Sequence, residues 1–292
     1  MAVGLVIIAL IASPLLVPAE MRFVRIGVVC LTWTFAAKLW DCWSPSALAK
    51  MDAGGERPTR AQYLGFFAHP LVMTIEESRW LPPGTRRWPE LGRLAAGAAT
   101  FALGAALLRW MLATRFGSSG FLLDHTTKVV VLAVMIESGS QLACALARLA
   151  GLDVRPIVDW AVLARSPADF WHRYNRMIGA WLHKHVFIPA GGRRRYIRAT
   201  ALTFLLSGLG HECLFALLSG RATGYAFAFF MVQVPAVAVS AALHRRVRRP
   251  GPGLRLLGRL ATIAFVLASS VLFFAAFCQI APDFYAARCP LG

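Results

Sequence analysis

Long apolar stretches constrain the fold of this chain more than any other feature of its sequence. Seven of them approach or reach the ~18–20 residues that a helix needs to cross a bilayer, at 2–19, 23–39, 91–112, 127–147, 199–219, 223–243 and 260–281. Of the 292 residues, 58% are hydrophobic and 15% are charged, whereas soluble domains carry about 25% charged residues. The sequence therefore predicts an all-α polytopic membrane protein with about seven to eight transmembrane helices, plus interfacial or re-entrant helices.

The net charge of +17 is distributed in a way that orients these helices. Segments 38–93, 148–198 and 244–259 hold 8, 10 and 6 of the 31 Lys and Arg residues. Cytoplasmic loops carry such an excess, so these segments and the amino terminus are expected on the cytoplasmic side of a bacterial-type inner (plasma) membrane. The expected partners of this charge are membrane lipids with anionic headgroups, and no nucleic acid is needed.

The chain is expected to form a single membrane-embedded domain over residues 1–292, with the informative motifs in 151–243. The first stretch, 2–19, lacks the basic start of a signal peptide and is expected to remain as an anchor helix. The stretch 63–75 is apolar but too short to span, so an interfacial or re-entrant position is expected. The six cysteines form no CxxC pair, so we expect no metal site.

Two ionisable residues, His211 and Glu212, lie inside the apolar stretch 199–219. A charged side chain at the centre of a membrane helix costs about 2.5–3.5 kcal/mol, so such residues usually mark a functional site. Burial favours the uncharged imidazole, which is the form that a general base needs. The histidine could instead hydrogen-bond a neighbouring helix and hold the bundle together. The adjacent Glu212, with Ser207 one turn back on the same face, favours a functional role.

A second polar segment begins about thirty-five residues upstream. Ser166, Pro167 and Asp169 are residues typical of a helix start, and they predict a helix over 169–192. Its first stripe is aromatic and suits a membrane interface, where it would serve as an anchor; it comprises Phe170, Tyr174, Trp181 and His185. Its second stripe could form the wall of a site; it comprises His172, Asn175, Gly179 and His183. Taken singly, His172, His183 and His185 are expected to be exposed at the interface.

Three further groups of polar residues lie outside these two segments, and two of them allow more than one interpretation. The basic run 193–195 fits a topology determinant, and it also lies where cytoplasmic phosphates could bind. Glu137 and Gln141 share a helix face, because they are four residues apart, and they either bond a partner helix or line a cavity. Asp124, His125 and Lys128 are interpreted as residues at a helix boundary.

Two blocks of this sequence, taken together, resemble a known family. The first is Ser166-x-x-Asp-Phe-Trp-x-Arg-x-Asn175, followed by Trp181, Val186-Phe-x-Pro189 and Gly191-Gly192; the second is Phe204-x-x-Ser-Gly-Leu-x-His-Glu212. They cover about 50 residues, and their order and separation are similar to those of the membrane-bound O-acyltransferase (MBOAT) superfamily, wax synthase-like branch. Tyr174 stands where the family often has tryptophan. The first 150 residues resemble the family in hydropathy only.

This resemblance implies specific roles for the matched residues. His211 is expected to deprotonate an acceptor hydroxyl, and Asn175 to position or polarise a thioester carbonyl. Supporting roles fall to Glu212, Trp171 and Arg173, and Ser207 and His183 are further candidates on the same helix faces. The implied acyl donor is acyl-CoA, a co-substrate rather than a bound cofactor. From charge and position, we expect its phosphates to bind at Arg193, Arg194 and Arg195.

The function expected on this basis is transfer of an acyl group from acyl-CoA to a lipidic alcohol, as in a wax ester synthase. Three alternatives remain open on the sequence alone. One is O-acetylation of a glycan or a small secondary metabolite. The others are a transporter with an ion relay through Glu137, His211 and Glu212, and a non-catalytic scaffold in which His211 only packs.

Overall fold

The computed structural model describes residues 2–18, 20–45, 47–48, 58–247, 251–287 and 291. Six helices within them are long and apolar enough to cross a membrane, which confirms an all-α polytopic protein. They are α2 (Arg22–Trp43), α5 (Trp88–Ala113), α6 (Phe121–Leu149), α9 (Tyr196–Ser219), α10 (Tyr225–Arg246) and α11 (Pro252–Cys278).

The first apolar stretch differs from the prediction. It forms helix α1 (Ala2–Ala12), which ends at the short 3₁₀ helix η1 (Ser13–Leu16). The ring and missing N–H of Pro14 prevent an α-helix from continuing there, and 11 helical residues extend only about 16 Å. The predicted span over 2–19 is therefore wrong, and the expected seven to eight spanning helices become six in the described parts of the chain.

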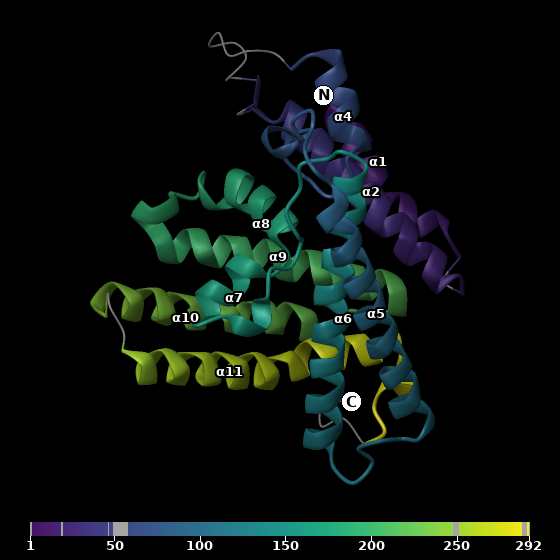
Figure 1. Ribbon diagram of the computed structural model, residues 1–292, viewed down its shortest axis with the longest axis vertical. Helices are drawn as coiled ribbons and strands as arrows, with labels where there is room; N and C mark the ends of the chain where they lie inside the picture. Colours follow the sequence, from purple (N-terminus) through teal and green to yellow (C-terminus); the bar gives the residue numbers. More distant parts are fainter. Residues whose placement is uncertain are drawn as a thin grey trace.

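The long helices form two groups (Figure 1). Helices α9, α10 and α11 lie side by side in one layer, and the hairpin of α5 and α6 crosses this layer. Two short helices, α7 (Pro167–Arg173) and α8 (Arg176–Leu182), lie against the layer, with α7 in contact with α10 and α11. Buried Phe204, Phe229, Phe230 and Val237 form the core between these elements.

The segment predicted as one helix over 169–192 is divided into several pieces. Helix α7 begins as expected, because the Ser166 hydroxyl accepts the Asp169 N–H at 3.2 Å. It ends at Arg173, since Tyr174 is extended and Asn175 adopts a left-handed backbone with φ 47°, a conformation that asparagine tolerates better than most residues. After α8 come a π-turn, η4 (His183–Phe187), and a 3₁₀ turn, η5 (Gly192–Arg195).

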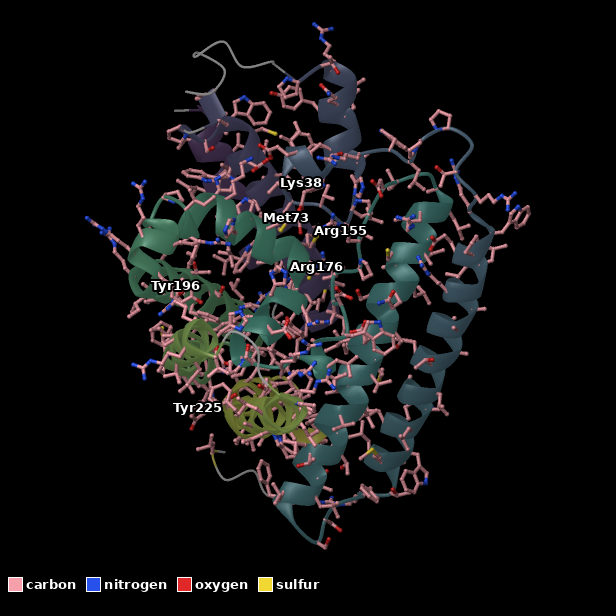
Figure 2. All side chains as sticks on the ribbon, turned by 60° about the vertical axis from the view of Figure 1, so that its left-hand side comes forward. Lys38, Met73, Arg155, Arg176, Tyr196 and Tyr225 are labelled. Carbon is pink, nitrogen blue, oxygen red and sulfur yellow. The ribbon has the colours of Figure 1, made fainter. Side chains whose placement is uncertain are left out.

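The apolar stretch 63–75 also forms a short element. Helix α4 (Arg60–Ala68) is followed by a turn and by the 3₁₀ helix η2 (Ile75–Glu77). The buried ammonium of Lys38 on α2 donates hydrogen bonds to the carbonyls of Phe66 and His69, at 2.7 and 2.6 Å. Lys38 and Met73 lie in the same upper part of the molecule (Figure 2). This segment is thus attached to α2 through its backbone.

Helix α6 begins at Phe121, six residues before the predicted span. Asp124 and Lys128 are fully buried and paired at 2.5 Å. The second oxygen of Asp124 accepts the backbone N–H groups of Ala286 and Ala287, at 2.6 and 3.0 Å. These residues do lie near a helix end, as predicted, since they occupy the first two turns of α6. They are nevertheless buried, and Asp124 and Lys128 pair with each other and with residues after α11.

Candidate active site

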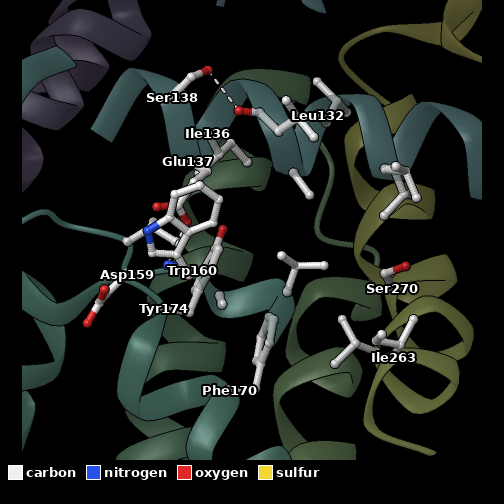
Figure 3. Close-up of a pocket in the computed structure, with 18 of the residues that line it drawn as sticks. Leu132, Ile136, Glu137, Ser138, Asp159, Trp160, Phe170, Tyr174, Ile263 and Ser270 are labelled. Carbon is white, nitrogen blue, oxygen red and sulfur yellow. Dashed lines mark hydrogen bonds between the residues drawn. The ribbon is translucent and has the colours of Figure 1, made fainter. Parts of the chain in front are cut away.

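A cavity of about 800 Å³ lies where the α5–α6 hairpin crosses the layer of α9 to α11. Most of its wall is apolar or aromatic, with contributions from α5, α6, α7, α9, α10, α11 and the segment between α6 and α7. The polar groups of the wall include His211, Glu137, Gln141 and Ser270. Figure 3 shows how polar residues such as Glu137 and Asp159 lie apart from the apolar residues around Phe170 and Ile263.

His211 reaches this cavity from α9. Its Nδ1 atom lies 2.8 Å from the carbonyl oxygen of Ser207, one turn earlier in the helix. A carbonyl oxygen can only accept, so Nδ1 carries the proton, and the neutral ring keeps its lone pair on Nε2. The rings of Phe230 and Phe273 pack against the imidazole, with centroids at 4.4 and 6.0 Å. The geometry therefore leaves one basic nitrogen in an aromatic cavity.

Trp171, from the Phe-Trp motif, forms part of the cavity wall. Its ring packs against Phe204, Phe229 and Phe230, with centroids 5.2 to 6.1 Å apart. Its indole N–H donates to the buried side chain of Gln233 at 3.1 Å. This contact joins α7 to α10 and fixes the wall beside His211.

Tyr174 and Asn175 follow at the end of α7. Tyr174 lines the cavity, and burial raises the pKa of its phenol, which therefore stays protonated and able to donate. The Asn175 oxygen accepts the Ile178 N–H at 3.4 Å and caps α8. Its amide nitrogen has no hydrogen-bond partner within the described part of the chain. Asn175 is not among the residues that line the cavity, so its predicted role with a thioester carbonyl stays a prediction.

The remaining candidates lie outside the cavity wall. Glu212 points to the start of α10, where its carboxylate accepts the N–H groups of Gly224 and Phe227 at 2.6 and 3.2 Å. Arg173 binds Asp169 at 2.9 Å and the carbonyl of Asp159 at 3.2 Å, which holds the segment before α7 in place. Ser207 contributes its backbone carbonyl to His211.

His183 is exposed and stacks on Phe187 with ring centroids 5.3 Å apart. Exposure is also observed for His172, as expected. Arg193, Arg194 and Arg195 are exposed on η5, where they are accessible to an anion. The structure thus brings His211 and Trp171 together and leaves these five side chains at the surface.

One buried polar cluster was not predicted. The fully buried carboxylate of Asp41 on α2 accepts from Lys184 and His185 at 2.7 Å each and from the Ile75 N–H at 2.8 Å. The expected exposure of His185 is wrong, because its side chain is 3% exposed. Burial alone would lower the pKa of Lys184, but hydrogen bonds and charge attraction from Asp41 and Glu76 raise it. The available sequence signal was an acid two residues beyond the apolar stretch 23–39.

Known proteins with similar sequences agree with this architecture. The family model for membrane-bound O-acyltransferases matches residues 98–275. Two Arabidopsis thaliana proteins are similar to the chain. One, probable long-chain-alcohol O-fatty-acyltransferase 6, is 29% identical over 228 residues, which cover 74% of this chain and 64% of that protein. The other, probable long-chain-alcohol O-fatty-acyltransferase 2, is 27% identical over 136 residues, covering 43% and 40%.

The chain thus spans less than two thirds of the length of these curated relatives. Both belong by name to the long-chain-alcohol acyltransferases, which confirms the resemblance to the wax synthase-like branch. The family match includes α6 to α10 entirely, and therefore the helices that carry His211, Trp171 and Asn175. The chain belongs to the membrane-bound O-acyltransferase family.

Proposed function

We propose that the protein transfers an acyl group from acyl-CoA to the hydroxyl of a lipidic alcohol. The observation that carries this proposal is the Nε2 of His211, which has no hydrogen-bond partner among the described residues and lies in a largely apolar cavity. An apolar, aromatic wall favours a lipidic acceptor over a glycan, because a bound glycan would bury many hydroxyls without hydrogen-bond partners. The names of the two plant relatives support the same class of acceptor.

In the proposed step, Nε2 of His211 takes the hydroxyl proton while the alcohol oxygen attacks the thioester carbonyl. The carbon–sulfur bond then breaks, the ester forms, and the proton passes to the departing thiolate to give free CoA. General base catalysis of this kind contributes about 10²- to 10⁴-fold. The rest of the acceleration would come from positioning two reactants in a site that excludes water.

We further propose that Asn175 donates a hydrogen bond from its amide to the thioester carbonyl. Its oxygen is already held by α8, which directs the amide nitrogen to serve as the donor. Left-handed backbone in a residue other than glycine is costly and often occurs at functional sites. Its neighbour Tyr174 lines the cavity, so a small movement of this turn would bring the amide to the wall.

The basic residues support a cytoplasmic entry for acyl-CoA. Segments 38–93, 148–198 and 244–259 hold most of the Lys and Arg residues, and we place them on the cytoplasmic side. Arg193, Arg194 and Arg195 would then meet the CoA phosphates, because guanidinium groups bind phosphates in a bidentate manner. A plasma-membrane location and a cytoplasmic amino terminus stay predictions.

The test is an acyl-transfer assay on purified protein in nanodiscs. Labelled acetyl-, octanoyl- and palmitoyl-CoA are offered with a panel of lipidic alcohols. We expect ester from the wild type, and a loss of about 10²- to 10⁴-fold in His211→Ala. The matched control, His172→Ala, removes an exposed histidine and should keep wild-type turnover. A folded wild type that releases no CoA from any donor would favour a transporter or scaffold.

A further inference from the structure

One face of α6 carries a row of polar side chains through a helix that is otherwise apolar. Its members recur every three or four residues and therefore share a face; they are Glu137, Ser140, Gln141, Cys144 and Arg148. This row extends from the end of α6 to its middle, a distance of about 16 Å at 1.5 Å per residue. Such a row at membrane depth requires polar partners.

The partners are supplied by the segment between α6 and α7, which runs back along the helix. Four hydrogen bonds occur in the same order along both elements. The carbonyl of Val154 accepts from the Arg148 guanidinium at 3.3 Å and from the Cys144 thiol at 3.6 Å. The Val158 N–H donates to the Ser140 hydroxyl at 2.8 Å, and the Trp160 N–H donates to the Glu137 carboxylate at 2.9 Å. Backbone polar groups outside regular secondary structure need hydrogen-bond partners where they are buried. The row on α6 therefore fixes the path of residues 154–160.

Trp160 stands at the end of this path in an unusual conformation. Its backbone is left-handed, with φ 50° and ψ 49°, although it carries a large side chain. Its indole lines the cavity and is 54% exposed, so it lies where the cavity meets the surface. Figure 3 shows the indole beside Glu137, whose carboxylate accepts the Trp160 N–H. Strained backbone of this kind persists only where neighbouring contacts hold it.

Glu137 provides such a contact. One carboxylate oxygen accepts the Trp160 N–H at 2.9 Å, and the other accepts the Gln141 side-chain amide at 2.9 Å. Each oxygen is therefore committed to a hydrogen bond within the protein. This arrangement suits a group that holds backbone in place. Acid–base chemistry suits His211 instead, because its Nε2 has no hydrogen-bond partner in the described part of the chain.

We propose that Trp160 is a specificity-determining residue at the mouth of the cavity, and that Glu137 is the positioning residue that holds it there. The inference rests on the proposed acyl transfer, since it assigns substrate choice at that same cavity. The indole narrows the mouth, so unbranched chains pass and chains with methyl branches are disfavoured. Removing the indole widens the mouth without touching His211.

The first experiment compares two alcohols of equal carbon number, hexadecanol and a multiply methyl-branched C16 alcohol. We expect Trp160→Ala to raise kcat/KM for the branched alcohol relative to hexadecanol about tenfold or more, because one methyl group in an apolar site changes discrimination by about 10- to 200-fold. The gain should appear mainly in KM. The control is Trp88→Ala, which removes a 78% exposed indole that does not line the cavity. The same ratio in all three proteins would overturn the proposal.

The second experiment tests the role of Glu137. Glu137→Ala should reproduce the change in preference seen in Trp160→Ala, and Glu137→Gln should largely restore the wild-type ratio, because an amide oxygen still accepts the Trp160 N–H. Hydrogen exchange at the Trp160 amide should be faster in Glu137→Ala than in the wild type or Glu137→Gln. Unchanged exchange in Glu137→Ala would overturn the positioning role.

A measurement without turnover separates this proposal from the proposed function. A hexadecanol that carries a diazirine is crosslinked to the protein by light. Unlabelled hexadecanol or the branched C16 alcohol is added as a competitor, and the loss of crosslinking is measured. We expect the branched alcohol to compete about tenfold better in Trp160→Ala than in the wild type. If the branched alcohol competes equally well in Trp160→Ala and in the wild type, the proposed role of Trp160 at the mouth of the cavity is overturned. If the wild type makes no ester, the acyl-transfer proposal fails, and this competition still decides the role of Trp160.

Discussion

The Oε1 atom of Glu212 lies 2.6 Å from the backbone nitrogen of Gly224, so the acid next to the candidate base serves the following helix. Its second oxygen accepts the Phe227 N–H at 3.2 Å. The first N–H groups of a helix have no partner within the helix, and a negative charge there is favoured by the helix dipole. The His-Glu pair thus combines a cavity residue with a cap for α10.

Replacing Glu212 should therefore affect stability more than chemistry. Glu212→Ala leaves the N–H groups of Gly224 and Phe227 without this acceptor, at a cost of about 0.5–2 kcal/mol, as for the loss of a helix cap. We expect a lower melting temperature in detergent and a kcat that falls far less than in His211→Ala. Glu212→Gln keeps one acceptor oxygen, so its melting temperature should lie between those of the wild type and Glu212→Ala. An unchanged melting temperature with a hundredfold loss of kcat would instead assign Glu212 to the chemistry.

Asn175 calls for a different substitution, because its backbone is left-handed. Alanine there would add about 1–2 kcal/mol of backbone strain, whereas Asn175→Gly removes the amide and tolerates φ 47°. We expect kcat to fall roughly 10²-fold in Asn175→Gly, as for loss of one hydrogen-bond donor to a reacting carbonyl. The measurement is kcat on samples matched by melting temperature. Near wild-type kcat would reduce Asn175 to a helix cap.

The cluster around Asp41 predicts a large effect far from the cavity. Asp41→Ala would leave Lys184, His185 and the Ile75 N–H without their buried acceptor. Breaking a buried ion pair by removing one partner costs about 3–5 kcal/mol, so we expect poor yield and a strongly reduced melting temperature. The control is Glu77→Ala, which removes an exposed carboxylate on η2. Equal melting temperatures for the two variants would contradict a stabilising role for the cluster.

His69 predicts a dependence of stability on pH. Burial, and then the charge of Lys38, lower its pKa below the ordinary value. The unfolded chain therefore binds this proton more readily than the folded chain, so stability is full above about pH 6.5 and falls as pH drops toward the folded pKa. Uptake of this one proton lowers the free energy of unfolding by at most about 1.4 kcal/mol per pH unit.

The check is the melting temperature between about pH 7.5 and pH 5. His69→Asn cannot take up this proton and keeps an oxygen for the Leu71 N–H, which now bonds Nδ1 at 3.3 Å. We expect a flatter profile in His69→Asn than in the wild type. His244→Asn, at an exposed histidine of α10, should keep the wild-type slope. Identical slopes in all three proteins would show that His69 does not control acid stability.

Hydropathy predicted the long helices well because burial in lipid requires continuous apolar sequence. It failed where charges neutralise one another. The start of α6 was placed six residues late, since Asp124 and Lys128 look polar until their pairing is known. Hydropathy also overestimated the length of the first helix, because one proline ends it although the composition stays apolar.

The candidate site was predictable for residues in short motifs, such as His211 and Trp171, which line one cavity. Contacts between residues that are distant in sequence were not predictable. Glu137 was found as a polar residue, but its bond to Trp160 depends on a segment that turns back along α6. Likewise, nothing in the spacing of residues 183–185 indicated that His185 would meet Asp41, more than 140 residues away.

The pairing of Asp124 with residues 286 and 287 has a consequence for biosynthesis. Helix α6 leaves the ribosome more than a hundred residues before the tail segment that accepts and donates its buried hydrogen bonds. Until that segment is synthesised, Lys128 lacks the carbonyl of Phe284, and Asp124 lacks two N–H groups. The buried start of α6 therefore completes its hydrogen bonds only after α11 and the residues that follow it have been synthesised.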